Sequence, residues 1–443
     1  MKSTAFALLA FVSLWIAPAR AEPEVRVAPT VFVVPDPAAK ATTFTMIVKA
    51  GSGDEPHGKV HGLAHYLEHL VFLGRNADHK ATAARFFPDA ESNGYTTKLA
   101  TVFWQKFPLR PEGQTGDLEK LFGFYSGILK GLEVNEDEAR RERGVVLQEY
   151  NLRFGRSAQR RYIGRINRLL YPDHPRGQDG LGTKEEIEAL SAAEAYQFRN
   201  AWYTRDNTVF VVHGPVDVEA VKALAAKYIA AVPPRPNPDR AWLNTLMDFS
   251  PLDARENVVD KDVREVLVSI SKLVRFEETD RRRANAVRVI LGSFLRSSLD
   301  GSPKDAFVDQ SDLADEAPAV GIERPLAGAL ELTFYVTPKQ GVGQEAIVEA
   351  YTRYFGDLAA RGLDEKVVER LKKRYAEARA QYAKQPQSVA ENLVNWFAGR
   401  NSYEEYLDND ALVAKVEAAD VDLMLRALAL PGRRVAGSLS PAP

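Results

Sequence analysis

Two kinds of hydrophobic pattern alternate along this chain. Short runs rich in β-branched and aromatic residues predict strands, and longer stretches with apolar residues three and four positions apart predict amphipathic helices. The second half of the chain repeats the order of the first half. We predict strands at 42–53, 93–108, 207–214, 264–274, 328–338 and 433–439, and the main helices from about 62, at 117–132, from about 135, at 283–299 and within 344–400.

A proline-rich segment separates the two halves. Four prolines fall between Ala230 and Asn244, which suits an extended spacer and interrupts helices. We therefore predict an N-terminal domain at 22–235, a linker at 236–250 and a related C-terminal domain without a metal motif at 251–443. The order of the elements predicts an α+β fold with two similar domains, each a mainly antiparallel sheet with helices packed on one face.

The composition is that of a globular protein and narrows the choice of partners. Of 443 residues, 45% are apolar and 27% are charged, and the net charge of −2 gives no reason to expect a nucleic-acid partner. The chain has no cysteine, so it forms no disulfides. Any metal ion must then be bound by histidine, aspartate or glutamate.

The N-terminal residues resemble an export signal. Lys2 precedes an apolar run from Ala5 to Ala17, and Ala19-Arg20-Ala21 is a small-x-small cleavage pattern. We interpret residues 1–21 as a cleaved signal peptide, because the apolar run is too short to span a bilayer. The prediction is a periplasmic protein without a stable membrane anchor.

The stretch HGLAHYLEHLVFLG, residues 61–74, contains the strongest chemical signal. On a helix of about 3.6 residues per turn, His65, Glu68 and His69 share one face. Two imidazoles at this spacing can bind one tetrahedral metal ion, and the carboxylate of Glu68 can take a proton from a water molecule that zinc has acidified to a pKa of about 7. His57 and His61 continue the spacing upstream, but Gly58 and Gly62 predict that the helix starts near residue 62, so their roles stay open.

A catalytic zinc needs a third protein ligand. The acidic helix predicted from Asn135 offers Glu138, Glu142 and Glu149, which lie four and seven residues apart and so share a side of the helix. Spacing alone does not choose among them, and a solvent-exposed acidic face is the alternative interpretation.

The H-x-x-E-H motif is the inverzincin motif. Together with ERGVVLQE, residues 142–149, it resembles the pitrilysin family of zinc metallopeptidases, in particular the short, two-domain members. The resemblance continues at SNGYTTKLATVFW and at 180–214. It implies that one Zn²⁺ per chain is bound by His65, His69 and Glu149.

The same resemblance assigns further roles. It implies that Glu68 is the general base and that Glu142, the second acidic residue of the catalytic group, supports the site without binding the metal. Asn93, Gly94 and Tyr95 fall on the strand that pairs with an extended peptide substrate through backbone hydrogen bonds.

One departure from the family pattern bears on the partner. Active members use an arginine and a tyrosine in the second half to hold the substrate carbonyl, and the corresponding region, 291–321, has no such pair. Phe307 stands about where the tyrosine is expected. Such donors are typically worth about 3–4 kcal/mol of transition-state stabilisation. We therefore expect the zinc-bearing subunit of a heterodimer whose paralogous partner supplies the pair, with a homodimer as the other possible assembly.

The sequence thus predicts an exported zinc endopeptidase that cuts peptides or unfolded protein segments. A non-catalytic peptide-binding or scaffold subunit is the alternative, and the intact His65-Glu68-His69 set argues against it. A metal-dependent hydrolase of non-peptide substrates is a third possibility.

Overall fold

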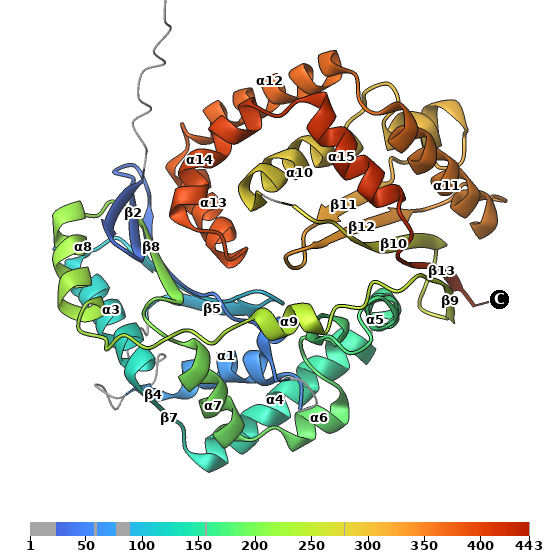
Figure 1. Ribbon diagram of the computed structural model, residues 1–443. Helices are drawn as coiled ribbons and strands as arrows, with labels where there is room; N and C mark the ends of the chain where they lie inside the picture. Colours follow the sequence, from blue (N-terminus) through green and yellow to red (C-terminus); the bar gives the residue numbers. More distant parts are fainter. Residues whose placement is uncertain (1–23, 57–59, 77–88, 156, 279, 443) are drawn as a thin grey trace, which may run out of the picture.

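The computed structural model describes residues 24–56, 60–76, 89–155, 157–278 and 280–442. The chain forms two large sheets, each with its own set of helices, and the two halves lie against each other (Figure 1). The N-terminal half is coloured blue to green and the C-terminal half yellow to red. The predicted signal peptide lies outside the described residues.

The N-terminal sheet has six strands in the order β1-β2-β8-β3-β6-β5. All neighbours are antiparallel except β2 and β8. β8 is buried along its whole length, because both faces of the sheet are covered there. The strands are β1 Val25–Ala28, β2 Val31–Pro35, β3 Ala41–Val48, β5 Glu91–Thr96, β6 Thr101–Pro108 and β8 Thr208–Gly214.

Helices cover one face of this sheet through apolar stripes that meet Phe44, Met46 and Phe210. The helices of this half are α1 Leu63–Leu73, α3 Thr115–Lys130, α4 Glu136–Gly155, α5 Ala158–Leu170, α6 Lys184–Ala189, α7 Ala192–Trp202 and α8 Val218–Leu224, continued by a π-helical turn at Ala225–Ile229. Smaller elements are the 3₁₀ turns Ser52–Asp54 and Pro175–Gly177 and the two-stranded pair β4 Arg75–Asn76 and β7 Leu132–Glu133.

The C-terminal sheet has five strands in the order β11-β12-β10-β13-β9, with β13 and β9 parallel and the rest antiparallel. Its strands are β9 Leu252–Asp260, β10 Leu267–Arg275, β11 Ala319–Glu323, β12 Ala329–Val336 and β13 Arg433–Pro441. The other elements from residue 241 on are α9 Ala241–Thr245, α10 Arg281–Leu295, a π-helical turn Asp305–Gln310, α11 Gln344–Arg361, α12 Glu365–Tyr382, α13 Pro386–Ala398, α14 Tyr403–Ala414 and α15 Ala418–Ala429.

Apart from β1, the two sheets have the same topology. In each, the first strand in the sequence pairs parallel with the last one, which lies next to the second strand. Beyond the second strand, the fourth and then the third strand complete the sheet. By this correspondence α1 in the first half matches α10 in the second, because each follows the second strand. α10 has the sequence RRRANAVRVILGSFL, which contains no histidine.

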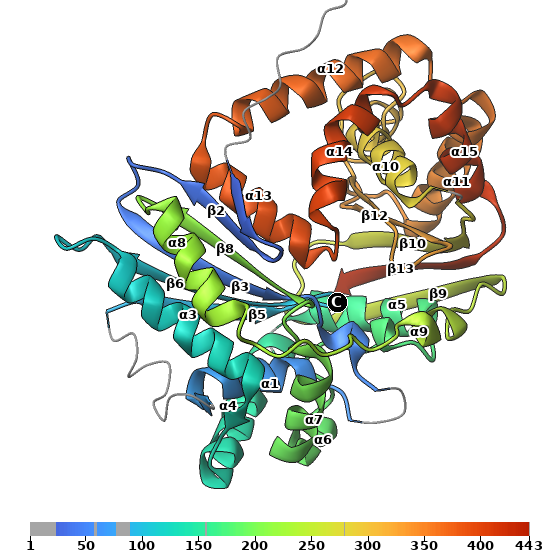
Figure 2. The ribbon, with the colours of Figure 1, turned by 60° about the vertical axis from the view of Figure 1, so that its left-hand side comes forward.

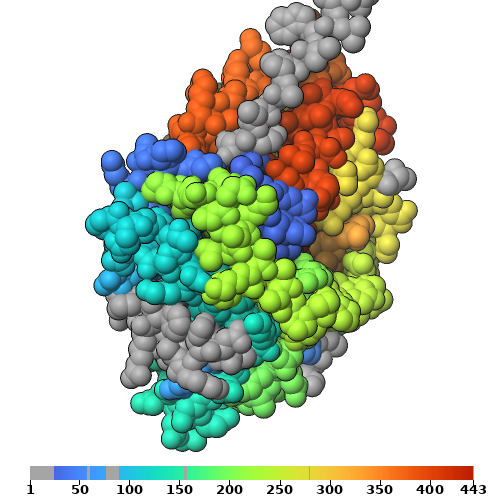
Figure 3. Space-filling view, turned by 90° about the vertical axis from the view of Figure 1, so that its left-hand side faces the viewer, coloured from blue at the N-terminus to red at the C-terminus, as the bar shows by residue number. Residues whose placement is uncertain are grey.

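Each half lends one helix to the other. α13, from the C-terminal half, packs on the second face of the N-terminal sheet, where Leu393 and Phe397 meet Phe32 and Val211. α5, from the N-terminal half, packs in the same way on β13 and β10. Figures 1 and 2 show both helices across the boundary between the halves, and in Figure 3 the orange and red C-terminal surface lies directly against blue N-terminal residues.

The predicted fold class is confirmed, with two corrections of detail. The stretch 93–108 is two strands, β5 and β6, joined by a turn at Thr97–Ala100, because Thr97 and Ala100 exchange hydrogen bonds there. The second correction is that helices pack on both faces of each sheet and not on one, because α13 covers the second face of the N-terminal sheet and α5 that of the C-terminal sheet. The domain boundaries at 22–235 and 251–443 stay a prediction. Within the ranges described, no helix is both long and apolar enough to cross a membrane.

Candidate metal centre

α1 begins at Leu63, immediately after Gly62, whose φ of +96° favours glycine. Glu55 caps the helix from the preceding loop. Its carboxylate accepts hydrogen bonds from the backbone N–H groups of Gly62 at 2.9 Å and Ala64 at 2.8 Å. This buried carboxylate satisfies two donors that a helix N-terminus leaves unpaired, and its charge suits the helix dipole.

One face of α1 is apolar, and the other carries the histidines and the glutamate of the motif. Leu63, Leu67 and Leu70 are buried in the N-terminal core. The face with His65, Glu68 and His69 turns toward α4 and β5, and the exposed fractions of His65 and Glu68 are both 6%. Packing of the apolar face therefore fixes the direction in which the three polar side chains point.

α4 brings the third potential ligand. It is held against α1 by buried Val146 and by a hydrogen bond of 2.7 Å from the Tyr66 hydroxyl to the carbonyl of Ala139. Glu149 Oε2 lies 3.5 Å from His65 Nε2 and 3.4 Å from His69 Nε2. The potential ligand atoms of these three residues all lie within 4.8 Å of one another.

The electrostatics of the group reflect burial and close charges. Burial lowers the pKa of His65 to about 4, with the charge of His69 acting in the same direction. Burial also acts to lower the pKa of His69, but hydrogen bonds with Glu142 and Glu149 outweigh it and raise the pKa to about 9. The hydrogen bond with His69 lowers the pKa of Glu149 to about 2. Glu149 is therefore a carboxylate and His65 a neutral imidazole at neutral pH.

The three acidic candidates of α4 have separate positions. Glu149 faces both histidines, whereas Glu142 Oε1 lies 2.6 Å from His69 Nδ1, the ring nitrogen that points away from Glu149. Glu138 turns elsewhere and forms an ion pair of 3.0 Å with Arg75. Arg153, one turn after Glu149, binds the other oxygen of that carboxylate.

Glu68 lies between the histidines and the edge strand β5. Its Oε2 accepts a hydrogen bond of 2.7 Å from the Thr96 hydroxyl, and burial raises its pKa to about 7. A Cβ at Gly94 would lie 2.9 Å from Glu68 Oε1, so the glycine makes room for the carboxylate. These side chains line a cavity of about 330 Å³ together with Asn93 and Tyr95.

The donor set fits zinc. Two imidazole nitrogens and one carboxylate oxygen are one of the ligand sets that catalytic zinc sites use, with a fourth position left for water or substrate. The approach of both Nε2 atoms to a single carboxylate oxygen leaves one common point for an ion, and the cavity beside it leaves room for a substrate. The carboxylate of Glu142 on the far nitrogen of His69 is the usual arrangement around a metal-binding histidine.

The other described histidines lie elsewhere. His61 lies 3.4 Å from Glu55 beside the start of α1, His174 caps a 3₁₀ turn and His213 lies 3.4 Å from Asp36. His57 lies outside the described residues. Phe307, which stands about where the family's tyrosine is expected, is buried in the C-terminal core against Phe334.

Sequence reasoning missed two residues that contact the group. Thr96 could have been found from strand alternation, because Gly94 and Thr96 share a face of β5. Arg153 could have been found from its spacing of four residues to Glu149 on a helix.

The fold and the donor set together define a class of protein: two matching α+β units with a candidate zinc centre beside an open sheet edge. Comparisons with known proteins agree. The family model described as "Insulinase (Peptidase family M16)" matches residues 30–161, and the model described as "Peptidase M16 inactive domain" matches residues 189–375. The two models together span more than half of the chain. The chain belongs to peptidase family M16, and the resemblance to pitrilysin-type zinc metallopeptidases is confirmed.

Individual relatives have low sequence identity to this chain, below 30% for the two described next. A probable mitochondrial-processing peptidase subunit beta from Schizosaccharomyces pombe is 29% identical over 200 residues, which cover 45% of this chain and 42% of that protein. Zinc protease PqqE from Helicobacter pylori is 27% identical over 280 residues, which cover 61% of this chain and 60% of that protein. Each match thus spans less than two thirds of the relative. The solved structure of a protease from Helicobacter pylori has the same fold, with a TM-score of 0.74 and 18% identity over 94% of this chain and 99% of that one.

Proposed function

We propose that this chain is a zinc-dependent endopeptidase in which His65, His69 and Glu149 bind the metal ion. The observation that carries the proposal is the approach of both imidazole Nε2 atoms to one carboxylate oxygen of Glu149, at 3.5 and 3.4 Å, beside a cavity and an edge strand. When bound, zinc supplies a Lewis acid that polarises a peptide carbonyl and acidifies a water molecule.

The protein residues supply positioning and proton transfer. Glu68 points into the cavity, where it takes the proton of the attacking water and passes it to the nitrogen of the departing amine. Thr96 holds one oxygen of this carboxylate, and the Glu68 side chain lines the cavity. Glu142 is a positioning residue, because it holds the ring of His69 through Nδ1.

The edge strand β5 supplies the substrate site. β5 is the last strand of its sheet, so one side of its backbone at Asn93, Gly94 and Tyr95 has no neighbouring strand among the described residues. An extended peptide that pairs with this edge lies along the wall of the cavity that contains Glu68. Such pairing selects extended or unfolded segments, because a folded substrate does not offer a free strand.

We further propose that the active form is a heterodimer with a paralogous subunit. The region 291–321 has no arginine–tyrosine pair like that of active family members, and Phe307 is enclosed by Phe334 and Tyr354 in the core. The partner then contributes the donors for the substrate carbonyl. The N-terminal sequence supports export to the periplasm, where the substrates are peptides or unfolded segments.

The test is cleavage of quenched peptides by the purified chain, alone and with the candidate partner, together with measurement of bound zinc. Glu68→Gln should keep about one zinc per chain and lower cleavage by about a hundredfold or more, because it removes the proton acceptor while retaining the shape. Cleavage by Glu68→Gln at the wild-type rate would remove Glu68 from the mechanism. Peptide binding without cleavage in every assembly would favour the alternative, a non-catalytic peptide-binding subunit.

A further inference from the structure

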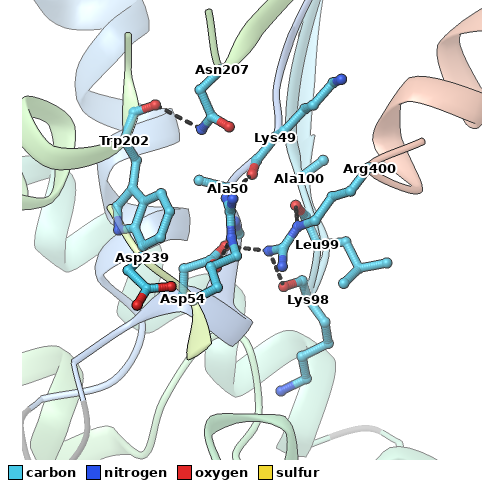
Figure 4. Close-up of polar contacts among 12 residues, drawn as sticks. Lys49, Ala50, Asp54, Lys98, Leu99, Ala100, Trp202, Asn207, Asp239 and Arg400 are labelled. Carbon is cyan, nitrogen blue, oxygen red and sulfur yellow. Dashed lines mark hydrogen bonds and ion pairs between the residues drawn. The ribbon is translucent and has the colours of Figure 1, made fainter. Parts of the chain in front are cut away.

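A buried group of charges joins the two halves of the chain next to the candidate metal centre (Figure 4). It consists of Asp54 in the loop before α1, Arg240 at the start of α9 and Arg400 just after α13, and we call it the arginine clasp. The side chain of Asp54 is 0% exposed, and its Oδ1 accepts a hydrogen bond of 2.9 Å from Arg240 Nε. Its Oδ2 accepts hydrogen bonds from Arg400 and from the backbone N–H of Gly51.

Arg400 also holds the turn between β5 and β6. Its Nε donates to the carbonyl of Leu99 at 2.7 Å, and its Nη2 lies 3.4 Å from the carbonyl of Lys98 (Figure 4). The φ of Arg400 is +63°, a conformation that is uncommon for a residue other than glycine and persists where the surroundings hold it. One side chain from the C-terminal half thus binds two separate segments of the N-terminal half.

Both segments continue directly into the metal centre. Glu55, the residue after Asp54, caps α1 at Gly62 and Ala64. Thr96, two residues before Lys98, holds Glu68 through its hydroxyl. The two segments also bind each other.

Their contact is made by backbone groups. Ser52 N–H donates to the carbonyl of Thr97 at 3.0 Å, and Gly53 N–H to that of Lys98 at 2.9 Å. A Cβ at Gly51 would lie 2.1 Å from the Thr97 carbonyl oxygen, so the two backbones approach as closely as glycine allows. With so little free space, a shift of one segment must move the other.

We propose that Arg400 is a positioning residue for the peptidase centre: from the C-terminal half it fixes both the loop that caps α1 and the turn that carries Thr96, and thereby sets Glu68 relative to the metal-binding histidines. This inference rests on the proposed function. A residue that acts in this way affects the rate of the chemical step more than the binding of substrate, because peptide pairing takes place at β5 itself.

The test compares Arg400→Lys with a matched control, Arg379→Lys. Lysine keeps the charge but lacks the planar fork that reaches a carboxylate and a carbonyl together. Arg379 is similarly buried, with 19% of its side chain exposed against 14% for Arg400, and it pairs with Asp410 inside the C-terminal half. In the fully assembled enzyme, R400K should lower kcat by about tenfold to a hundredfold. KM should stay within about threefold, and R379K should change neither constant by more than about twofold.

Two further measurements separate positioning from loss of stability. Backbone amide exchange at residues 62–66 and 96–100 should accelerate in R400K and stay at the wild-type rate in R379K. The effect of R400K on kcat should also be non-additive with that of Thr96→Val, because both act on Glu68. Should R400K fail to fold, Asp54→Asn breaks the same ion pair from its other end and carries the same expectations.

The outcomes are distinguishable. Wild-type exchange at 62–66 and 96–100 in R400K, an equal loss of kcat in R379K, or strict additivity with Thr96→Val would each overturn the positioning role. If the wild-type protein cleaves no peptide, the proposed function fails, and amide exchange alone still decides whether Arg400 holds these segments.

Discussion

Replacing Glu142 by glutamine tests how far the candidate metal centre depends on a residue that does not bind the metal. Glu142 Oε1 lies 2.6 Å from His69 Nδ1, and both side chains are mostly buried, so water does not readily replace the carboxylate. Loss of such a partner typically weakens metal affinity by about 10–100-fold, which corresponds to about 1.4–2.8 kcal/mol. We expect the E142Q protein to fold and to bind zinc with a dissociation constant raised by that factor.

The assay is competition for zinc with a chromogenic chelator at fixed pH, which needs no peptidase activity. Glu138→Gln is the matched control: it lies one turn earlier on α4 and pairs with Arg75 instead of the histidines. The control should leave the dissociation constant within about twofold of wild type. The ion pair that it breaks contributes at most about 1 kcal/mol to the stability of the fold and does not contact the histidines. Equal affinities for E142Q and wild type, or an equal loss in E138Q, would refute the assignment of Glu142 to His69.

Three further predictions concern the substrate wall, the exchanged helices and a buried charge. Gly94→Ala places a Cβ 2.9 Å from Glu68 Oε1, so peptide cleavage should fall by about tenfold or more while zinc affinity stays unchanged, as measured by initial rates and by chelator competition. Leu393→Ala removes a fully buried side chain between α13 and the N-terminal sheet and should lower the free energy of unfolding in urea by about 2–5 kcal/mol, whereas Leu407→Ala, which is 44% exposed, should cost far less. Burial raises the pKa of Glu331, so as pH rises this carboxyl ionises in the unfolded chain before it ionises in the folded protein. The free energy of unfolding should therefore fall as pH rises from the ordinary glutamate pKa to the raised one. A pH series of urea titrations should show this slope in the wild type and not in Glu331→Gln.

The sequence predicted the half of the site that depends on local geometry. His65, Glu68 and His69 share a face because helical spacing is the same in every protein, and the glycine before Leu63 marked the start of the helix. The choice among Glu138, Glu142 and Glu149 was different. It depends on the rotation of α4 against α1, which is set by contacts such as Val146 in the core and Tyr66 with Ala139. These contacts join residues about 70 or more positions apart and leave no local pattern.

The same distinction applies to the fold. Alternating strands and helices predicted two similar α+β units, because each strand or helix can be recognised from the spacing of its own hydrophobic residues. For α13, the sequence predicted only that it belongs to the helical region within 344–400. That it packs on Phe32 and Val211 of the other half follows from tertiary packing alone. The arginine clasp was equally invisible, because Asp54, Arg240 and Arg400 are single charged residues far apart in the sequence.

The exchange of α5 and α13 makes the two units mutually dependent. A chain that stopped before α9 would leave the second face of β2, β3 and β8 open to water, with Phe32, Ile47 and Val211 unprotected. A chain that began at β9 would leave β10 and β13 bare in the same manner. The arrangement is that of two subunits that have swapped a helix, except that one polypeptide carries both copies and they cannot drift apart. Truncation at the proline-rich segment should therefore yield two aggregation-prone fragments, neither of which folds independently. Mixing the two fragments should be required to recover a soluble protein.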